Sequence, residues 1–166
     1  MNNFPVSKKT RPWNQPNLPV YSLSTLDIDT GKHNMNICTY VSAITMDTKR
    51  FMIGVYKGTK TYDNLSKSSD AILQILSKDN LSLVRRFGKK SGKDIDKLKD
   101  QSNNLSTIGQ NVYLNNCISI MQLSFQKKVE VGDHDIFIFD VVKSKSLNHP
   151  KDILYSYDLK IAKIIG

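Results

Sequence analysis

Alternation of apolar and polar residues along most of the chain predicts β-strands rather than long helices. Runs rich in β-branched and aromatic residues, each bounded by turn-forming residues, mark these strands. The predicted strands are residues 19–26, 35–46, 50–56, 70–77, 111–114, 117–131 and 134–147. Gly132 and Asp133 lie between the last two strands and predict a hairpin turn.

Only two short helices are predicted, at residues 62–69 and 80–88. In the second helix, Asn80 can cap the start, Leu81, Val84 and Arg85 share a face, and Gly88 ends the helix. The lysine- and aspartate-rich segment that follows, up to residue 104, predicts a loop with one helical turn. The last fifteen residues of the chain fit either a strand or a helix.

The order of these elements predicts the fold class. Strands dominate and the helices do not alternate with them, which argues against a parallel doubly wound sheet. We therefore expect a mainly β fold, an antiparallel β-barrel with short helical insertions. Residues 1–16 are polar with three prolines and predict an N-terminal arm, while residues 17–166 predict a single domain.

The chain carries a formal net charge of +9, from 24 Lys and Arg against 15 Asp and Glu. A basic surface can bind nucleic acid, so a nucleic-acid-binding β-barrel is one hypothesis. The lysines are scattered and often stand beside acidic residues, and aromatic residues make up only 8% of the chain. Because single-strand-binding barrels interleave aromatic and basic residues, we favour a solvated basic surface and no nucleic-acid partner.

Cysteine and histidine placement argues against several chemistries. Cys38 and Cys117 lie far apart and form no CxxC motif, which predicts a reduced, cytoplasmic setting. The three histidines, His33, His134 and His149, are isolated, so no metal site is predicted. The first residues lack the apolar core of a signal peptide, and no run of roughly 18 apolar residues predicts a membrane span.

The stretch "GVYKGTKTYDNL" joins a predicted strand to a predicted helix and has the composition of an anion-binding loop. It departs from a P-loop, because three residues separate Gly54 from Gly58 and Thr59 precedes Lys60. A strand-loop-helix connection with hydroxyls and a lysine still suits a phosphate. The alternative is a solvated turn in which Thr61 only caps the helix.

Four stretches, in this order, resemble the flavin reductase-like family, whose fold is an FMN-binding split β-barrel. They are "LPVYSLSTLDIDTGKHNMNICTYVSAIT", "FMIGVYKGTKTYDNLSKSSDAILQIL", "RRFGKKSGKDIDKL" and "VGDHDIFIFDVV". The third resembles a family stretch that ends in Asp-Lys-Phe, with Leu98 in place of that Phe. Together the four stretches span residues 18–148.

The resemblance implies a homodimer that binds FMN, with FAD as the alternative, and accepts a hydride from NADH or NADPH. The flavin-binding residues that it implies are Asn36, Cys38, Thr39, Tyr40, Tyr56, Lys57, Thr59, Lys60, Thr61 and Asn64. For Tyr40 the alternative is core packing. His134 matches a histidine near the nicotinamide, with an ordinary hairpin histidine as the alternative. Phe139 stands where the family usually has glycine, so we expect it to narrow the nicotinamide pocket.

Three functional hypotheses follow from the sequence. The first is an FMN-dependent NAD(P)H oxidoreductase, and the second is a flavin-binding protein of the same fold without efficient reductase activity. The third is the basic nucleic-acid-binding barrel. The sequence leaves open the electron acceptor and the choice between NADH and NADPH, because no Rossmann fingerprint is present.

Overall fold

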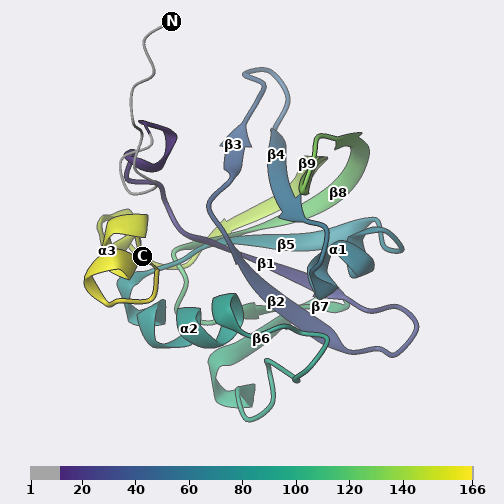
Figure 1. Ribbon diagram of the computed structural model, residues 1–166. Coiled ribbons are helices and arrows are strands. Elements are labelled where there is room, and N and C mark those ends of the chain that lie inside the picture. The colour runs from purple at the N-terminus through teal and green to yellow at the C-terminus, as the bar shows by residue number, and fades with distance from the viewer. Residues whose placement is uncertain (1–11, 166) are drawn as a thin grey trace, which may run out of the picture.

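A seven-stranded antiparallel sheet, curled into a half-barrel, organises the chain and confirms the predicted mainly β fold class (Figure 1). The computed structural model describes residues 12–165. The strands of the sheet are β1 (Tyr21–Leu26), β2 (His33–Cys38), β3 (Val41–Ala43), β4 (Arg50–Tyr56), β5 (Asp70–Ile75), β8 (Ser119–Glu130) and β9 (His134–Ser146). β6 (Leu105–Ile108) and β7 (Asn111–Leu114) form a separate hairpin. Residues 1–11 of the predicted arm lie outside the described residues.

The chain closes the half-barrel by crossing between its two edges. The strand order is β2-β1-β5-β8-β9-β4-β3, so the edge strands β2 and β3 are consecutive in the sequence. The prediction of one strand over residues 35–46 is therefore wrong, because the strand breaks at Thr39 and Tyr40. β2 pairs with β1, whereas β3 pairs with β4. The Gly54 amide donates to the Tyr40 carbonyl at 2.8 Å and holds the crossing against β4.

Three α-helices are present in the described part of the chain: α1 (Lys60–Leu65), α2 (Leu81–Lys89) and α3 (Ser156–Ile161). α1 begins earlier than predicted because Thr59 caps it, accepting a hydrogen bond from the Tyr62 amide at 3.2 Å. Thr61 is therefore not the cap. α2 lies within one residue of its prediction, but its buried residues are Val84 and Phe87, and Arg85 is exposed.

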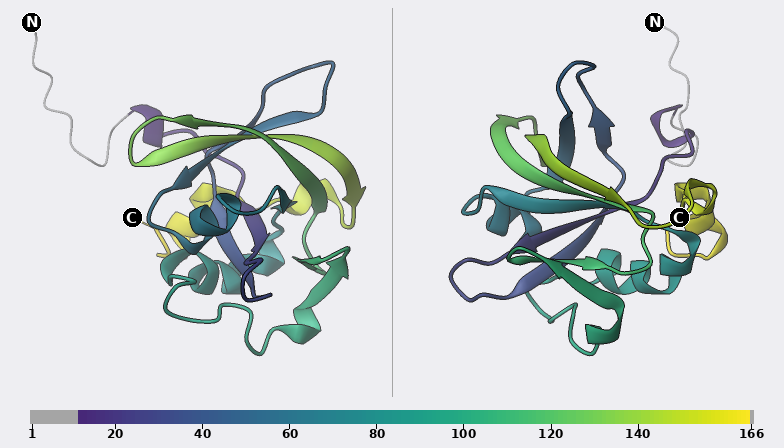
Figure 2. Two further views of the ribbon diagram at one scale, coloured as in Figure 1. Left: turned by 90° about the vertical axis from the view of Figure 1, so that its right-hand side faces the viewer. Right: turned by 180° about the vertical axis from the view of Figure 1, so that it is seen from behind.

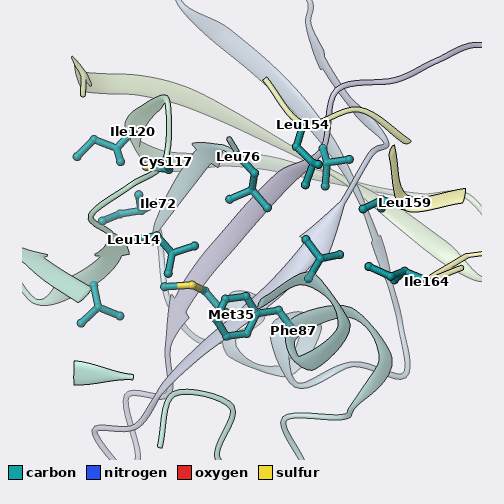
Figure 3. Packing of buried hydrophobic residues seen from close by; sticks show 13 residues of the cluster. Met35, Ile72, Leu76, Phe87, Leu114, Cys117, Ile120, Leu154, Leu159 and Ile164 are labelled. Atoms are coloured by element: carbon teal, nitrogen blue, oxygen red, sulfur yellow. The ribbon is translucent and has the colours of Figure 1, made fainter. Parts of the chain in front are cut away.

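Apolar side chains form two buried clusters, one on each face of the sheet. Inside the half-barrel, the cluster consists of Leu23, Ile53, Val55, Leu65, Ala71, Leu73, Leu123, Phe137 and Phe139. The other cluster joins β2 and β5 to α2, α3 and the β6–β7 hairpin, which lie on the same side of the sheet (Figure 2). Met35 and Phe87 lie next to each other in that cluster, between β2 and α2 (Figure 3).

Phe139 belongs to the cluster inside the half-barrel, and the expectation that it narrows a nicotinamide pocket is wrong. Its side chain is fully buried, stacked on Phe137 with ring centroids 6.3 Å apart and packed edge-on to Phe125 at 6.0 Å. Successive side chains of a strand point to opposite faces. His134 and Ile136 therefore face away from the side to which Phe139 points.

Lys97 is a buried lysine in the loop between α2 and β6. Only 4% of it is exposed, and its Nζ donates to the Phe87 carbonyl at 2.7 Å and the Met35 carbonyl at 3.1 Å. These bonds tie the loop to the end of α2 and to β2. Burial lowers the pKa of Lys97 to about 8, because the charged ammonium loses its hydration.

This pKa predicts that Lys97 makes stability depend on pH. Between pH 8 and 10.5, the ordinary lysine pKa, the unfolded chain binds this proton and the folded protein releases it. The Lys97 contribution to the free energy of unfolding should therefore rise with pH across that window. Urea unfolding of wild type and Lys97→Met, compared at each pH, isolates this term. A stability difference that stays constant from pH 7 to 10.5 would contradict the prediction.

Candidate functional site

Two adjoining clefts lie where the chain crosses from β2 to β3. The larger, the outer cleft, has a volume of about 460 Å³, and the smaller, the inner cleft, about 210 Å³. Both are lined by Thr39, Tyr40, Gly54 and His134. The outer cleft is completed by Val41, Ser42, Met52, Val131, Gly132, Asp133 and Ile136. The inner cleft is completed by Leu23, Asn36, Ile37, Cys38, Val55, Tyr56 and Thr61.

Most of the sequence-predicted site residues meet at the inner cleft. They are Asn36, Cys38, Thr39, Tyr40, Tyr56, Thr61 and His134, and they come from β2, the crossing, β4, α1 and β9. Four other predicted residues, Lys57, Thr59, Lys60 and Asn64, do not line this cleft. The local pattern alone could not bring these segments together, because they are adjacent only once the barrel curls.

Three aromatic rings gather where the two clefts join. The His134 imidazole lies edge-on to the Tyr40 ring, with centroids 5.5 Å apart, and 5.3 Å from the Tyr56 ring. Tyr40 is 58% exposed, so the alternative of core packing for it is wrong. A Cβ at Gly54 would come within 3.1 Å of the Tyr40 Cβ, so the glycine lets this tyrosine lie close against β4.

The His134 ring is oriented by its neighbour in the turn. Its Nδ1 lies 2.8 Å from Asp133 Oδ1, and the hydrogen bond to this imidazole lowers the pKa of Asp133. With Nδ1 engaged, Nε2 is the nitrogen left to meet a ligand. Asp133 lines the outer cleft beside His134.

Both lysines of the predicted phosphate loop are paired with carboxylates. Lys60 Nζ lies 2.7 Å from Asp27 Oδ2, and this hydrogen bond lowers the pKa of Asp27. Lys57 Nζ lies 3.1 Å from Asp135 Oδ1. Neither lysine therefore carries an uncompensated positive charge that is available to bind an anion.

The other loop residues are held by the β1–β2 hairpin. Thr61 accepts a hydrogen bond from Asn34 Nδ2 at 2.9 Å, and Asn64 Nδ2 donates to Thr25 Oγ1 at 3.1 Å. Asn64 is only 2% exposed and anchors α1 to β1. The sequence-based prediction missed Thr25 and Asn34. Their polar side chains inside or beside a predicted strand were the signal that could have marked them as site residues.

Asp135 is a third residue that the sequence-based prediction missed, although it directly follows "GDH". It is fully buried and accepts hydrogen bonds from the Tyr62 hydroxyl at 2.7 Å and the Val131 amide at 3.3 Å. Burial acts to raise its pKa, but the bonds from Tyr62 and Lys57 outweigh burial and the pKa is lowered. The carboxylate therefore stays charged and ties α1 to the turn that carries His134.

A third cleft, the polar cleft, has a volume of about 430 Å³. Four lysines and four aspartates line it, together with Asn34 and Gly92. Asn34 lies in its wall and donates a hydrogen bond to Thr61, which lines the inner cleft, so the two clefts share this wall. The polar cleft is balanced in charge, because its lysines and aspartates are equal in number.

Burial raises the pKa values of the Cys38 and Cys117 thiols to about 12, so neither is a thiolate nucleophile. Among residues 12–165, no three His, Cys, Asp or Glu side chains are grouped to hold a metal ion. Within the same residues, no helix has the length and apolar character needed to cross a membrane.

An antiparallel half-barrel whose edge strands β2 and β3 are joined by one crossing, with a cleft at that crossing, defines a split-barrel domain. The chain belongs to the family described as the flavin reductase like domain, whose model matches residues 17–163. This confirms the resemblance seen in the sequence, and membership of this family supports a flavin-linked redox function.

Known proteins of this fold include several flavoproteins. The chain is similar to an FMN-binding protein from Thermus thermophilus, crystallised with 1-cyclohex-2-enone, with a TM-score of 0.78 and 17% identity over 95% of this chain and 92% of that one. An NADH:FAD oxidoreductase from Streptomyces globisporus C-1027, in complex with NAD and FAD fragments, gives a TM-score of 0.73 and 14% identity over 85% of each chain.

One curated relative is similar in sequence. The high molecular weight rubredoxin of Moorella thermoacetica is 25% identical over 127 residues, which is 76% of this chain. The matched region is 56% of that protein, so this chain spans little more than half the length of its relative.

Proposed function

We propose that this protein binds FMN at the two adjoining clefts and passes electrons from NADH or NADPH through the flavin to an acceptor. The observation that supports the proposal is the inner cleft, where six predicted flavin-binding residues and His134, from five separate segments, meet. Their convergence at the split of a flavin reductase-like barrel supports one ligand that contacts all of these segments.

The residues present fit a flavin. The outer cleft has the size of a cofactor site, since such sites are about 300–1,000 Å³ and mostly apolar with a few polar groups. Val41, Met52 and Ile136 supply apolar walls, and Gly54 lets the Tyr40 side chain pack against β4 at the junction of the clefts. Asn36 and Thr61 supply the polar groups at the inner end.

A bound flavin would supply the hydride acceptance and electron transfer that protein side chains lack. The chain's own residues bind and orient it. The apolar walls exclude water, the Tyr40 and Tyr56 rings flank the opening, and His134 presents Nε2 at the junction of the clefts. We assign the nicotinamide of NAD(P)H to the outer cleft, on the face reached by His134.

The ion pairs of the loop change how a flavin phosphate is held. A free lysine would add a charge-assisted hydrogen bond worth roughly 1.5–3 kcal/mol. Because Lys57 and Lys60 already pair with Asp135 and Asp27, we expect the lysines to add less than this. Neutral hydrogen-bond donors around Thr61 are then expected to contribute more to phosphate binding than the lysines do.

Titration of apo-protein with FMN, followed by quenching of flavin fluorescence, tests the binding part of the proposal. We expect saturable binding with one FMN per chain, and no binding of a single-stranded oligonucleotide at 150 mM salt, roughly the physiological ionic strength. Retention of the oligonucleotide without flavin binding would favour the basic nucleic-acid barrel instead. An FAD titration in parallel reports the preferred flavin.

A homodimer is part of the proposal, because apolar side chains around the outer cleft are left exposed. The hairpin of β3 and β4 projects from the body (Figure 1), with Ile44, Met46 and Met52 exposed on it and Tyr40 exposed next to it. Exposed apolar patches of this kind mark interaction surfaces. A second copy would cover them and complete the wall of the cleft.

Light scattering is expected to give twice the chain mass of 18.8 kDa, and Met46→Asp should shift the protein toward the monomer with weaker FMN binding. Met46 is the most exposed of these apolar residues, so its replacement disturbs no internal packing. The matched control is Ile28→Asp, a change at an exposed apolar residue outside the hairpin. A wild-type monomer that still binds FMN tightly would contradict the shared site.

A further inference from the structure

Asn34 lies in the wall between the inner cleft and the polar cleft, outside the loop that the sequence indicated. It stands on β2 opposite Thr25 of β1, is 4% exposed and lines the polar cleft. Its Nδ2 donates to Thr61 Oγ1 at 2.9 Å, and Thr61 lines the inner cleft. One buried hydrogen bond therefore joins the walls of the two clefts.

The direction of this hydrogen bond determines what Thr61 can offer a ligand. A threonine hydroxyl has one proton and two lone pairs, whereas an amide nitrogen has only protons to give. Asn34 Nδ2 therefore occupies a lone pair and leaves the Thr61 proton available. In the hydrogen bonds of residues 12–165, no protein group accepts that proton. Thr61 is thus left as a donor beside the inner cleft.

The amide is held in this orientation although its other end lacks a partner. Asn34 Oδ1 is buried and accepts no hydrogen bond from the described residues, which is unfavourable for a polar atom. Gly92 packs directly over this oxygen, since a Cβ at Gly92 would stand 2.1 Å from Oδ1 and 3.1 Å from Lys60 Cβ. Only a glycine lets the loop after α2 close over the amide.

We propose that Asn34 is a positioning residue that presents the Thr61 hydroxyl proton to the phosphate of bound FMN. This rests on the proposed function and names the part of the flavin that the residue pair recognises. Lys57 and Lys60 are already paired with carboxylates. The Thr61 hydroxyl is therefore the neutral hydrogen-bond donor that remains available to the phosphate. FMN binding should depend on Asn34, whereas binding of riboflavin, which lacks the phosphate, should not.

The test compares FMN and riboflavin affinities of the full chain by fluorescence titration. In Asn34→Asp, the carboxylate accepts the Thr61 proton and removes the donor. We expect its FMN dissociation constant to rise roughly tenfold or more, with riboflavin changed by less than about threefold. Asn34→Ala frees the hydroxyl to rotate and should give a smaller loss for FMN alone. Thr61→Ser keeps the hydroxyl and should lose less FMN affinity than Thr61→Val, which removes it.

The Thr61→Val background separates positioning from the added negative charge. In Thr61→Val the hydroxyl is absent, so Asn34→Asp can weaken FMN binding only through its negative charge. The difference between the losses that Asn34→Asp causes in the wild-type and Thr61→Val backgrounds is therefore the positioning effect. Gly92→Ala, which displaces the amide, should give the same FMN-selective loss and serves if Asn34→Asp does not fold. Equal losses for both flavins, or an undiminished Asn34→Asp effect in Thr61→Val, would overturn the positioning role. A wild-type chain that binds neither flavin would instead overturn the proposed function itself, and the positioning role with it.

Discussion

Replacing His134 by alanine is expected to slow the reduction of bound FMN by NADH roughly ten- to a hundredfold, or about 1.4–2.7 kcal/mol in the transition state. The imidazole lines both clefts, and Asp133 holds its Nδ1 so that Nε2 can meet the nicotinamide. A hydrogen bond there to the carboxamide, or an offset to charge as the hydride leaves, is lost in the variant. Anaerobic stopped-flow bleaching of the flavin band measures the rate.

The same experiment distinguishes a role at the nicotinamide from a structural one. FMN affinity should stay nearly unchanged in His134→Ala, because His134 is assigned to the nicotinamide and the other residues that line the two clefts hold the flavin. His149→Ala is the matched control, since His149 lines neither cleft and its loss should leave the rate unchanged. Equal rates in His134→Ala and wild type would remove His134 from the mechanism. Loss of FMN together with activity would make the residue structural.

Phe139→Ala is expected to destabilise the fold by about 3–5 kcal/mol without changing flavin reduction in the protein that remains folded. The Phe139 ring is fully buried against Phe125 and Phe137, so its removal leaves a cavity inside the half-barrel. The ring points away from the face on which His134 and Ile136 line the outer cleft. Urea unfolding and the bleaching rate are measured on the same preparation.

Val142→Ala is the control on the same strand. Val142 is 66% exposed, so its truncation should change the free energy of unfolding by no more than about 0.5 kcal/mol. A Phe139→Ala variant with wild-type stability and faster reduction by NADH would place the ring at the nicotinamide pocket after all.

Local patterns predicted the bounds of some single elements. "RFMIGVY" predicted β4 to the residue, and Gly132 with Asp133 predicted the turn between β8 and β9. The break at Thr39 was not predictable from propensity, because residues 35–46 contain no glycine or proline. That break exists because the two halves of the run pair with different strands, which is a property of the curled sheet.

Many residues that line the clefts could be predicted from the sequence, but the ion pairs of the site could not. Asn36, Tyr40 and Thr61 meet at one cleft, but the carboxylate partners of the loop lysines come from elements distant in sequence. The orientation of Phe139 was ambiguous because "IFIF" is apolar on both faces of the strand, so alternation gave no direction. The β6 strand was missed because four residues within a polar segment carry too little pattern.

The most direct test of the proposed function is the anaerobic absorbance spectrum of the FMN-loaded protein before and after NADH or NADPH is added. We expect a bound-flavin band that survives gel filtration, bleaches with one of the two nicotinamides and returns when oxygen is admitted. A band that persists with both nicotinamides would indicate a flavin-binding protein without reductase activity. A chain that retains no flavin after gel filtration would contradict the central claim.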